Sequence, residues 1–418
     1  MGMKRSPPVT LLLRVLLPFA AGYFLSYLYR TVNAVIAPEL TEDFSLAAAD
    51  LGLLTSTYFL TFAAFQLPLG VLLDRYGPRR VEAGLLLLAA LGALLFAYAA
   101  EMADLLLARG LIGLGVSACL MASFKALVLW FPRGQLPMVN GWVMAAGGLG
   151  ALTATAPVEM LLGFTDWRGL FLGLSLLTLL TAALIFTLVP EHPEHRSSED
   201  FPSQLRGLGS VFHSGLFWRL APLTTLSQAT ALSVQGLWAG PWLHDVAGLD
   251  RQGVARGLLF IACAMVAGFL TLGGMAYRLS QWGVPPVAVT LVGMIIFMLV
   301  QALLLLAPAL PVLVLWMPFG FFGTTGILAY AVLSQHFEGR LAGRVNTAIN
   351  LLVFVGAFAA QWGVGAIVGA YPAEEAGRYA PSGYRTAFCT LLLLQLLALA
   401  WYFLAPRLQR RWRRRSRR

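Results

Sequence analysis

The fold is decided by the stretch Gly70-Val71-Leu72-Leu73-Asp74-Arg75-Tyr76-Gly77-Pro78-Arg79-Arg80, which lies between two long apolar runs. Six of these eleven residues are charged or glycine, so the stretch interrupts an otherwise apolar sequence. Lysine and arginine are retained on the cytoplasmic side of membrane proteins. The pattern therefore predicts a tight cytoplasmic loop between two membrane-spanning helices, with an ordinary basic turn as the alternative.

The composition excludes a water-soluble domain. The 418 residues are 59% hydrophobic and 11% charged, with a mean hydropathy of +0.76, which is more apolar material than a soluble core can bury. A spanning helix needs about 20 apolar residues. We expect about twelve such helices, at 11–36, 50–73, 82–100, 104–130, 138–163, 168–189, 216–239, 256–278, 284–307, 310–335, 345–370 and 384–405. The sequence therefore predicts an all-α membrane protein with an N-terminal bundle (1–190), a cytoplasmic linker (191–215), a C-terminal bundle (216–405) and a basic tail (406–418).

The distribution of charge predicts the topology and the partners. The net charge is +10, and eight of the 29 lysines and arginines lie in the tail from Arg407 to Arg418. Because most other basic residues fall on the same side, we expect both termini to be cytoplasmic in a multi-pass protein of the cell membrane. The tail is interpreted either as an anchor to anionic lipid headgroups or as a solvated extension. A nucleic-acid partner is not expected, and the three isolated cysteines indicate neither a disulfide framework nor a metal site.

The stretch from Gly70 to Arg80 resembles the loop signature of the major facilitator superfamily, Gly-x-Leu-x-Asp-Arg-x-Gly-x-Arg-Arg. This resemblance implies two pseudo-symmetric bundles of six helices and transport by alternating access. It also implies that the loop is a gating latch whose aspartate, Asp74, faces the start of the eleventh helix near Arg344. A degenerate copy at Gly273–Arg278 is consistent with diverged repeats. The gating residues implied are Gly70, Asp74, Arg75, Gly77 and Arg79.

The first expected span carries the candidate substrate site. Tyr27 and Arg30 share one helical face, and Asn33 follows. An arginine within a span is costly and is a functional hypothesis by default, with a structural pair as the alternative. The segment Tyr27-Leu28-Tyr29-Arg30 resembles the first helix of organic-anion and organophosphate carriers of the superfamily. Organophosphate carriers of the superfamily have a second arginine deep in the seventh helix, whereas the seventh span here has only Arg219, at its cytoplasmic end. The resemblance therefore argues against a phosphate ester and leaves a single-arginine site for a carboxylate.

Two further charged residues are candidates for proton coupling. Arg109 lies in a fourth-span Arg-Gly pattern similar to that of the superfamily, and Glu159 is interpreted as the only acid well inside a span. Both lie near the outer ends of neighbouring spans, so we expect a pair that either responds to protons or is static. Lys125 is expected to extend to the cytoplasmic end of its helix rather than to contact substrate.

Uncharged polar residues mark the expected C-terminal bundle. Gln228 and Gln235 share a face of the seventh span, with Trp238 about one turn further on, and the eleventh span carries Asn350. Amides and aromatic rings facing a cavity can orient a ligand, and Tyr330 is a further candidate. Hydrogen bonds between helices are the alternative.

The function predicted is secondary transport rather than catalysis. The sequence contains no phosphate-cradling loop and no legible catalytic constellation, so neither an enzyme nor a cofactor is expected. We expect proton-coupled movement of a small organic anion by a monomer, by symport or antiport. The alternatives are export of amphipathic or cationic compounds, and a non-transporting membrane sensor.

Overall fold

The computed structural model describes residues 9–132, 135–191, 209–306, 312–335, 337, 339–372 and 378–415. Contacts divide the chain into two compact units, unit 1 with Met1–Ser45 and Thr57–Phe201, and unit 2 with Leu46–Ser56 and Pro202–Arg418. Most of the expected linker, 192–208, and the end of the expected tail, 416–418, lie outside the described residues. The domain boundaries expected from the sequence stay a prediction.

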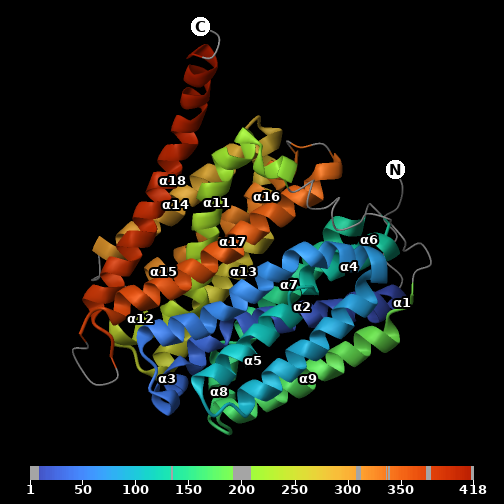
Figure 1. Ribbon diagram of the computed structural model, residues 1–418, viewed down its shortest axis with the longest axis vertical. Helices are drawn as coiled ribbons and strands as arrows, with labels where there is room; N and C mark the ends of the chain where they lie inside the picture. Colours follow the sequence, from blue (N-terminus) through green and yellow to red (C-terminus); the bar gives the residue numbers. More distant parts are fainter. Residues whose placement is uncertain are drawn as a thin grey trace. The chain divides into compact units, whose positions relative to one another are not determined.

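The first half of the chain forms a series of helices that belong to unit 1, except for the start of α4 up to Ser56, which belongs to unit 2 (Figure 1). They are α1 (Val9–Leu11), the π-helix η1 (Leu12–Leu16), α2 (Leu17–Thr31), α3 (Asn33–Phe44), α4 (Ala48–Ala97), α5 (Met102–Gly115), α6 (Cys119–Trp130), α7 (Leu136–Thr153), α8 (Ala156–Leu162) and α9 (Trp167–Leu188). Helix α2 packs against α6, α7 and α9, so it is the centre of this unit.

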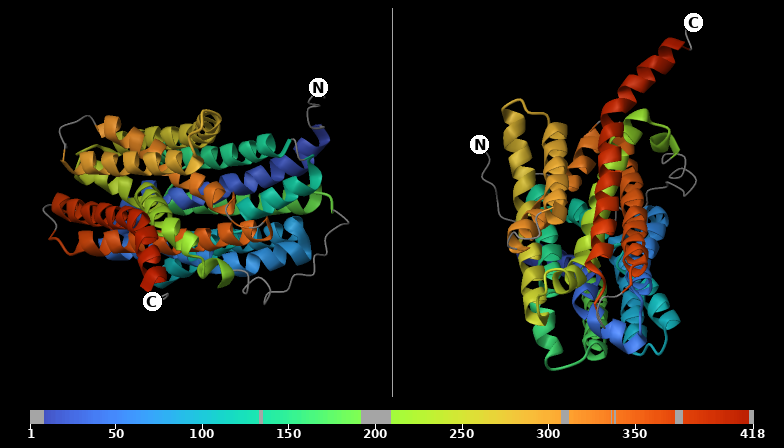
Figure 2. Two further views of the ribbon diagram at one scale, coloured as in Figure 1. Left: turned by 90° about the horizontal axis from the view of Figure 1, so that it is seen from above. Right: turned by 90° about the vertical axis from the view of Figure 1, so that its left-hand side faces the viewer.

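The second half continues with helices of unit 2 (Figure 2). They are α11 (Gly215–Ser233), the π-helix η3 (Val234–Trp238), α12 (Ala239–Asp245), α13 (Arg251–Gln281), α14 (Pro286–Leu306), α15 (Val312–Gly323), the 3₁₀ turn η4 (Thr324–Ile327), α16 (Leu328–Gln335), α17 (Gly339–Gly369) and α18 (Pro381–Arg415). Helix α11 packs on α17 and α18, and α13 packs on α15.

Eight helices in the described part of the chain are long and apolar enough to cross a membrane, and nine if the bent pair α7–α8 is one span. This number understates the expected spans because α4 alone contains 50 residues. At 1.5 Å per residue, a straight helix of this many residues would measure about 75 Å, more than twice the thickness of a bilayer core. Helix α4 therefore contains the two spans expected at 50–73 and 82–100.

The two arms of α4 meet at Gly77, where the backbone has φ 78° and ψ 160°. These angles belong to a region that is essentially restricted to glycine. The expected loop is thus reduced to a one-residue break, because both arms stay helical up to Gly77 and Pro78 suits the first turn of the second arm. The deciding stretch therefore makes the sharp turn that the sequence predicts, with less loop than expected.

Glycines let α7 approach α2 closely. A methyl group added at Gly150 would overlap the Phe24 carbonyl oxygen, and one added at Gly147 would lie 2.5 Å from a Tyr23 ring carbon. Small residues allow membrane helices to pack backbone against backbone. This contact brings the tyrosine-rich face of α2 against the fifth span.

A buried acid ties α12 to α18 in unit 2. The side chain of Asp245 is only 3% exposed. It accepts hydrogen bonds from the Tyr384 hydroxyl (2.6 Å), the Tyr379 amide (3.3 Å) and His244 Nδ1 (2.7 Å). Hydrogen bonds to a charged group are stronger than those between neutral groups. Asp245 therefore fixes the end of the seventh span to the start of the twelfth.

We expect Asp245→Asn to lower the free energy of unfolding by about 1–3 kcal/mol, because the amide replaces a charged acceptor with a neutral one and adds an unpaired donor. Thermal unfolding of the purified protein would measure the change. Asp250→Asn is the matched control, since Asp250 caps α13 by accepting from the Gly253 amide and asparagine caps a helix equally well. Equal midpoints for the two variants would contradict the role of Asp245.

Candidate functional site

The candidate substrate residues of unit 1 gather in the last turn of α2 and the turn that follows. Arg30 is 6% exposed, and its guanidinium carbon lies 4.5 Å from the Tyr27 ring centroid and 5.6 Å from that of Phe62. Tyr27 packs edge-on against Tyr23, with ring centroids 5.2 Å apart, and Asn33 is fully buried at the start of α3. The structure thus brings Tyr27 and Arg30 together as the helical spacing predicts.

Arg109 occupies a different environment from Arg30. It is fully buried on α5, and its Nη2 donates to the Tyr29 carbonyl oxygen at 2.8 Å. Its guanidinium also lies 5.1 Å from the Tyr58 ring, whose hydroxyl donates to the Ser26 carbonyl oxygen. These contacts join α5 and α4 to the backbone of α2, while Nε and Nη1 of Arg109 are buried without a hydrogen-bond partner in the described structure. The expected coupling role of Arg109 stays a prediction.

The expected pair of Arg109 and Glu159 does not form. Within the described residues the contacts of Arg109 are to α2 and α4, whereas Glu159 lies half-buried on α8, beyond a 42° bend. A second acid is not considered in the sequence interpretation. Glu82, near the start of the second arm of α4, is fully buried.

The gating residues are held by contacts within unit 1. Asp74 forms an ion pair with Lys125 of α6. That Lys125 extends to the cytoplasmic end of its helix stays a prediction. The expected approach of Asp74 to the start of the eleventh helix stays a prediction. Arg75 is exposed and lies over the Tyr76 ring at 5.4 Å, and Gly70 is half-buried one turn before Asp74.

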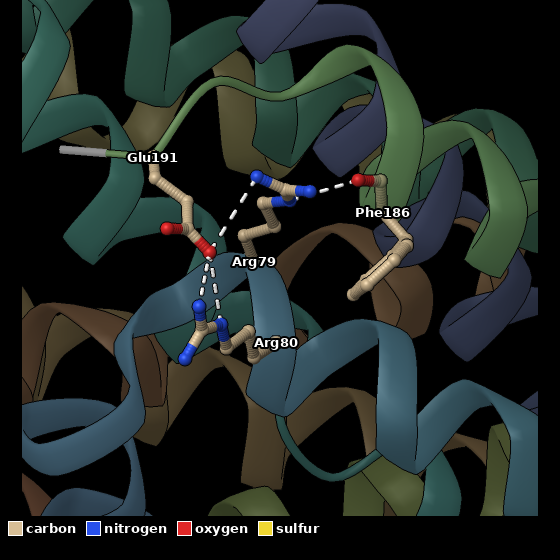
Figure 3. Close-up of polar contacts among 4 residues, drawn as sticks. All are labelled: Arg79, Arg80, Phe186 and Glu191. Carbon is tan, nitrogen blue, oxygen red and sulfur yellow. Dashed lines mark hydrogen bonds and ion pairs between the residues drawn. The ribbon is translucent and has the colours of Figure 1, made fainter.

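Two neighbouring arginines hold the start of the linker (Figure 3). Arg79 donates through Nε to the Phe186 carbonyl oxygen at 2.8 Å and lies over the Phe186 ring, 4.8 Å from its centroid. Arg80 binds the Glu191 carboxylate through Nε (2.9 Å) and Nη2 (2.5 Å), and Arg79 Nη1 is 3.7 Å from the same oxygen. Glu191 is 54% exposed, so this cluster orients the chain after α9 more than it stabilises the fold.

The polar residues of unit 2 do not form one group. Gln228 donates to the Gly323 carbonyl oxygen at 2.8 Å, and Tyr330 donates to Asn350 Oδ1 at 3.2 Å. Gln235 is half-buried within the π-helix η3. The Gln228 contact therefore joins α11 to α15, as the alternative of interhelical hydrogen bonds predicts.

Trp238 has a packing role in the structure. It is fully buried, donates to the Gln361 carbonyl oxygen at 2.9 Å and lies edge-on to Tyr384, with ring centroids 6.3 Å apart. An added methyl group at Gly365 would lie 3.1 Å from its ring. Because no part of the ring is accessible, the expectation that it stacks on a ligand does not fit this conformation.

Within the described residues, no group of three or more histidines, cysteines or acids is placed to hold a metal ion. His192 and His195 of the expected linker lie outside the described residues.

The comparisons with known proteins agree on one family. The family model described as Major Facilitator Superfamily matches residues 19–361. A protein described as a probable sulfoacetate transporter from Cupriavidus necator is 24% identical over 269 residues, 60% of this chain and 62% of that protein. The hexuronate transporter of Bacillus subtilis is 29% identical over 185 residues, 44% of each chain. The chain thus spans less than two thirds of the length of these relatives.

Solved structures show the same fold. A bacterial homologue of the human lysosomal transporter Spinster, inward-facing and unoccupied, has a TM-score of 0.76 at 20% identity, covering 96% of this chain and 98% of that one. A D-xylose–proton symporter has a TM-score of 0.71 at 15% identity, covering 92% and 96%.

Proposed function

Because the chain belongs to the Major Facilitator Superfamily, with twelve transmembrane helices in two pseudo-symmetric six-helix bundles, we propose that it moves a small organic anion across the membrane by alternating access. Members of this superfamily are transporters rather than enzymes.

The observation that carries the proposal is the buried guanidinium of Arg30 against the rings of Tyr27 and Phe62. Ring faces attract a cation, so Tyr27 and Phe62 orient the guanidinium group of Arg30. An arginine fork binds carboxylates and sulfonates through two parallel hydrogen bonds. The relatives named for sulfoacetate and hexuronates support the same ligand class.

Asn33 and the Tyr27 hydroxyl complete the proposed site within unit 1 by offering hydrogen bonds. Gln228, Gln235 and Asn350 are proposed separately as ligand-orienting residues of unit 2. Trp238 supports this arrangement by packing. Asp74 and Lys125, with Gly70, Arg75, Gly77 and Arg79, form the proposed gate, and both termini lie in the cytoplasm of a monomer in the cell membrane.

The positive charge of Arg30 bears on the two alternative functions, the exporter of cations and the membrane sensor. A buried arginine repels lipophilic cations, so their export requires a binding site away from Arg30. A membrane sensor would bind the same anion without moving it. Uptake by purified protein in liposomes separates a sensor from a transporter.

A thermal-shift panel tests the proposed ligand class. Ligand at 100 times its dissociation constant stabilises the folded state by about 2.7 kcal/mol, so we expect glucuronate or sulfoacetate to raise the unfolding midpoint by several degrees. Glucose, which lacks the carboxylate, should leave it unchanged. We expect Arg30→Gln to abolish the anion response because the variant removes the charge.

Arg219→Gln is the matched control. Arg219 also lies over a tyrosine ring, Tyr402, at 4.5 Å, and donates to the Tyr402 carbonyl oxygen, but it belongs to unit 2 near the start of α11. This variant should keep the anion response. Stabilisation by tetraphenylphosphonium alone, or an anion response that survives in Arg30→Gln, would contradict the proposal and favour the exporter.

A further inference from the structure

A second ionisable side chain lies inside unit 1, at a position that the proposed substrate site does not use. Glu82 is in the second arm of α4, five residues after the break at Gly77, and is fully buried. Neither carboxyl oxygen accepts a hydrogen bond from a nitrogen or oxygen donor of the described residues. None of the ion pairs found among the described residues involves Glu82.

The space that holds the carboxyl group is made by Gly22 of α2. A methyl group at Gly22 would overlap Glu82 Oε1, and the Ile185 side chain of α9 closes the same side. The polar group beside the carboxyl is the thiol of Cys119 on α6, which is a weak hydrogen-bond donor. Three helices thus enclose Glu82 with one thiol and apolar atoms.

The charged residues of these three helices form no ion pair with Glu82 in the described structure. Arg30 of α2 lies over the rings of Tyr27 and Phe62 and acts electrostatically on Cys119, Lys125 of α6 pairs with Asp74, and Arg168 of α9 donates to the carbonyl oxygens at 97 and 99. The other titratable groups of α2 are tyrosines, at positions 23, 27 and 29. In the described part of the unit, Cys119 is therefore the titratable group that contacts Glu82.

An ionised carboxylate in this setting is unfavourable. Burying a charge without a counter-charge or hydrogen-bond donors costs far more than burying the neutral acid. A proton bound to the carboxylate removes that cost, and acids inside membrane spans recur in proton pathways. The proton returns to water only when water reaches the group, which requires α2 to move away from the second arm of α4.

We propose that Glu82 is a proton-binding site of unit 1, loaded when Gly22 and Cys119 enclose it and unloaded to water when α2 separates from it. Proton binding stands on the geometry alone. Its use in transport rests on the proposed function, in which the proton accompanies the organic anion. Gly22 and Arg30 are eight residues apart on α2, about 12 Å along the axis, so movement of one helix reaches both sites.

Infrared difference spectroscopy of the protein in lipid nanodiscs tests the first part. A neutral carboxylic acid has a carbonyl band that a carboxylate lacks. We expect wild type minus Glu82→Gln to show this band at neutral pH, and the band to disappear reversibly as the pH is raised. Glu191→Gln is the control, because the Glu191 side chain is exposed and forms ion pairs with Arg79 and Arg80 as a carboxylate, so its difference spectrum should contain no such band.

A second variant protects the test against misfolding of Glu82→Gln. Cys119→Ala removes the polar contact and keeps the acid, so the same band should persist at a shifted frequency. The absence of a carboxylic-acid band from the wild-type difference spectrum, or a band that persists at every pH up to unfolding, would overturn the proposal.

Transport is measured separately. We expect Glu82→Gln proteoliposomes to retain glucuronate counterflow and to lose accumulation driven by a pH gradient. A wild-type protein that binds no anion but shows the Glu82 band would reject the proposed substrate and leave the proton site standing. Gradient-driven accumulation that survives in Glu82→Gln would reject the coupling role of Glu82 and leave the anion site standing.

Discussion

Replacing Arg30 with glutamine is expected to lower glucuronate uptake by proteoliposomes by about 30-fold to several thousand-fold, because removing one partner of a buried charge pair costs about 2–5 kcal/mol. The substituted amide keeps some hydrogen bonding and loses the charge. Arg30→Lys should retain more uptake than Arg30→Gln, since it keeps the charge and loses only the fork geometry. Initial rates at matched protein content provide the measurement.

Arg109→Gln is the informative counterpart, since Arg109 is the other arginine that is buried among the described residues of unit 1. Its bond to the Tyr29 carbonyl oxygen joins α5 to α2, so the variant should lower the unfolding temperature. Arg30→Gln should lower uptake strongly and change the unfolding temperature only slightly. Full uptake by Arg30→Gln, or a loss of uptake that merely follows the loss of folded protein, would contradict the assignment.

Gly77→Ala is expected to reduce the free energy of unfolding by about 1–3 kcal/mol and the yield of folded protein with it. A side chain at φ 78° and ψ 160° is strained whatever space surrounds it. Thermal unfolding in detergent would measure the loss.

Gly84→Ala provides the control in the same arm of α4. An added methyl group there meets nothing within 4 Å, so this change should stabilise the helix by about 0.5–1 kcal/mol. A Gly77→Ala protein as stable as Gly84→Ala would show that the break tolerates a side chain.

The fold could be predicted from the sequence because its signals are local. Apolar length predicts spanning helices, and the residues from Gly70 to Arg80 predict the turn between the second and third spans. The extent of α4 could not be predicted, because the helical arms on both sides of Gly77 depend on packing as well as on the charges of the stretch. The π-helical turns η1 and η3 have no sequence signature.

The candidate site could be predicted in part. Tyr27 and Arg30 meet because they are one turn apart on a single helix, whereas Glu82 was missed because it begins the expected span at 82–100. The sequence held one signal that could have drawn attention to Glu82, namely the uncharged run from Ala83 to Ala100 that directly follows it. Its enclosure by Gly22 and Cys119 depends on three helices meeting, which periodicity within one helix cannot predict.

The π-helix η3 carries a consequence for insertions and deletions. A π turn holds one residue more than an α turn, so removing a single residue between Val234 and Trp238 would let the seventh span continue as a regular α-helix. Because the π turn absorbs this extra residue, the helix after the deletion would keep its orientation relative to α11. Asp245 would still face Tyr384, so a relative with a one-residue alignment gap at 234–238 should keep both of those residues.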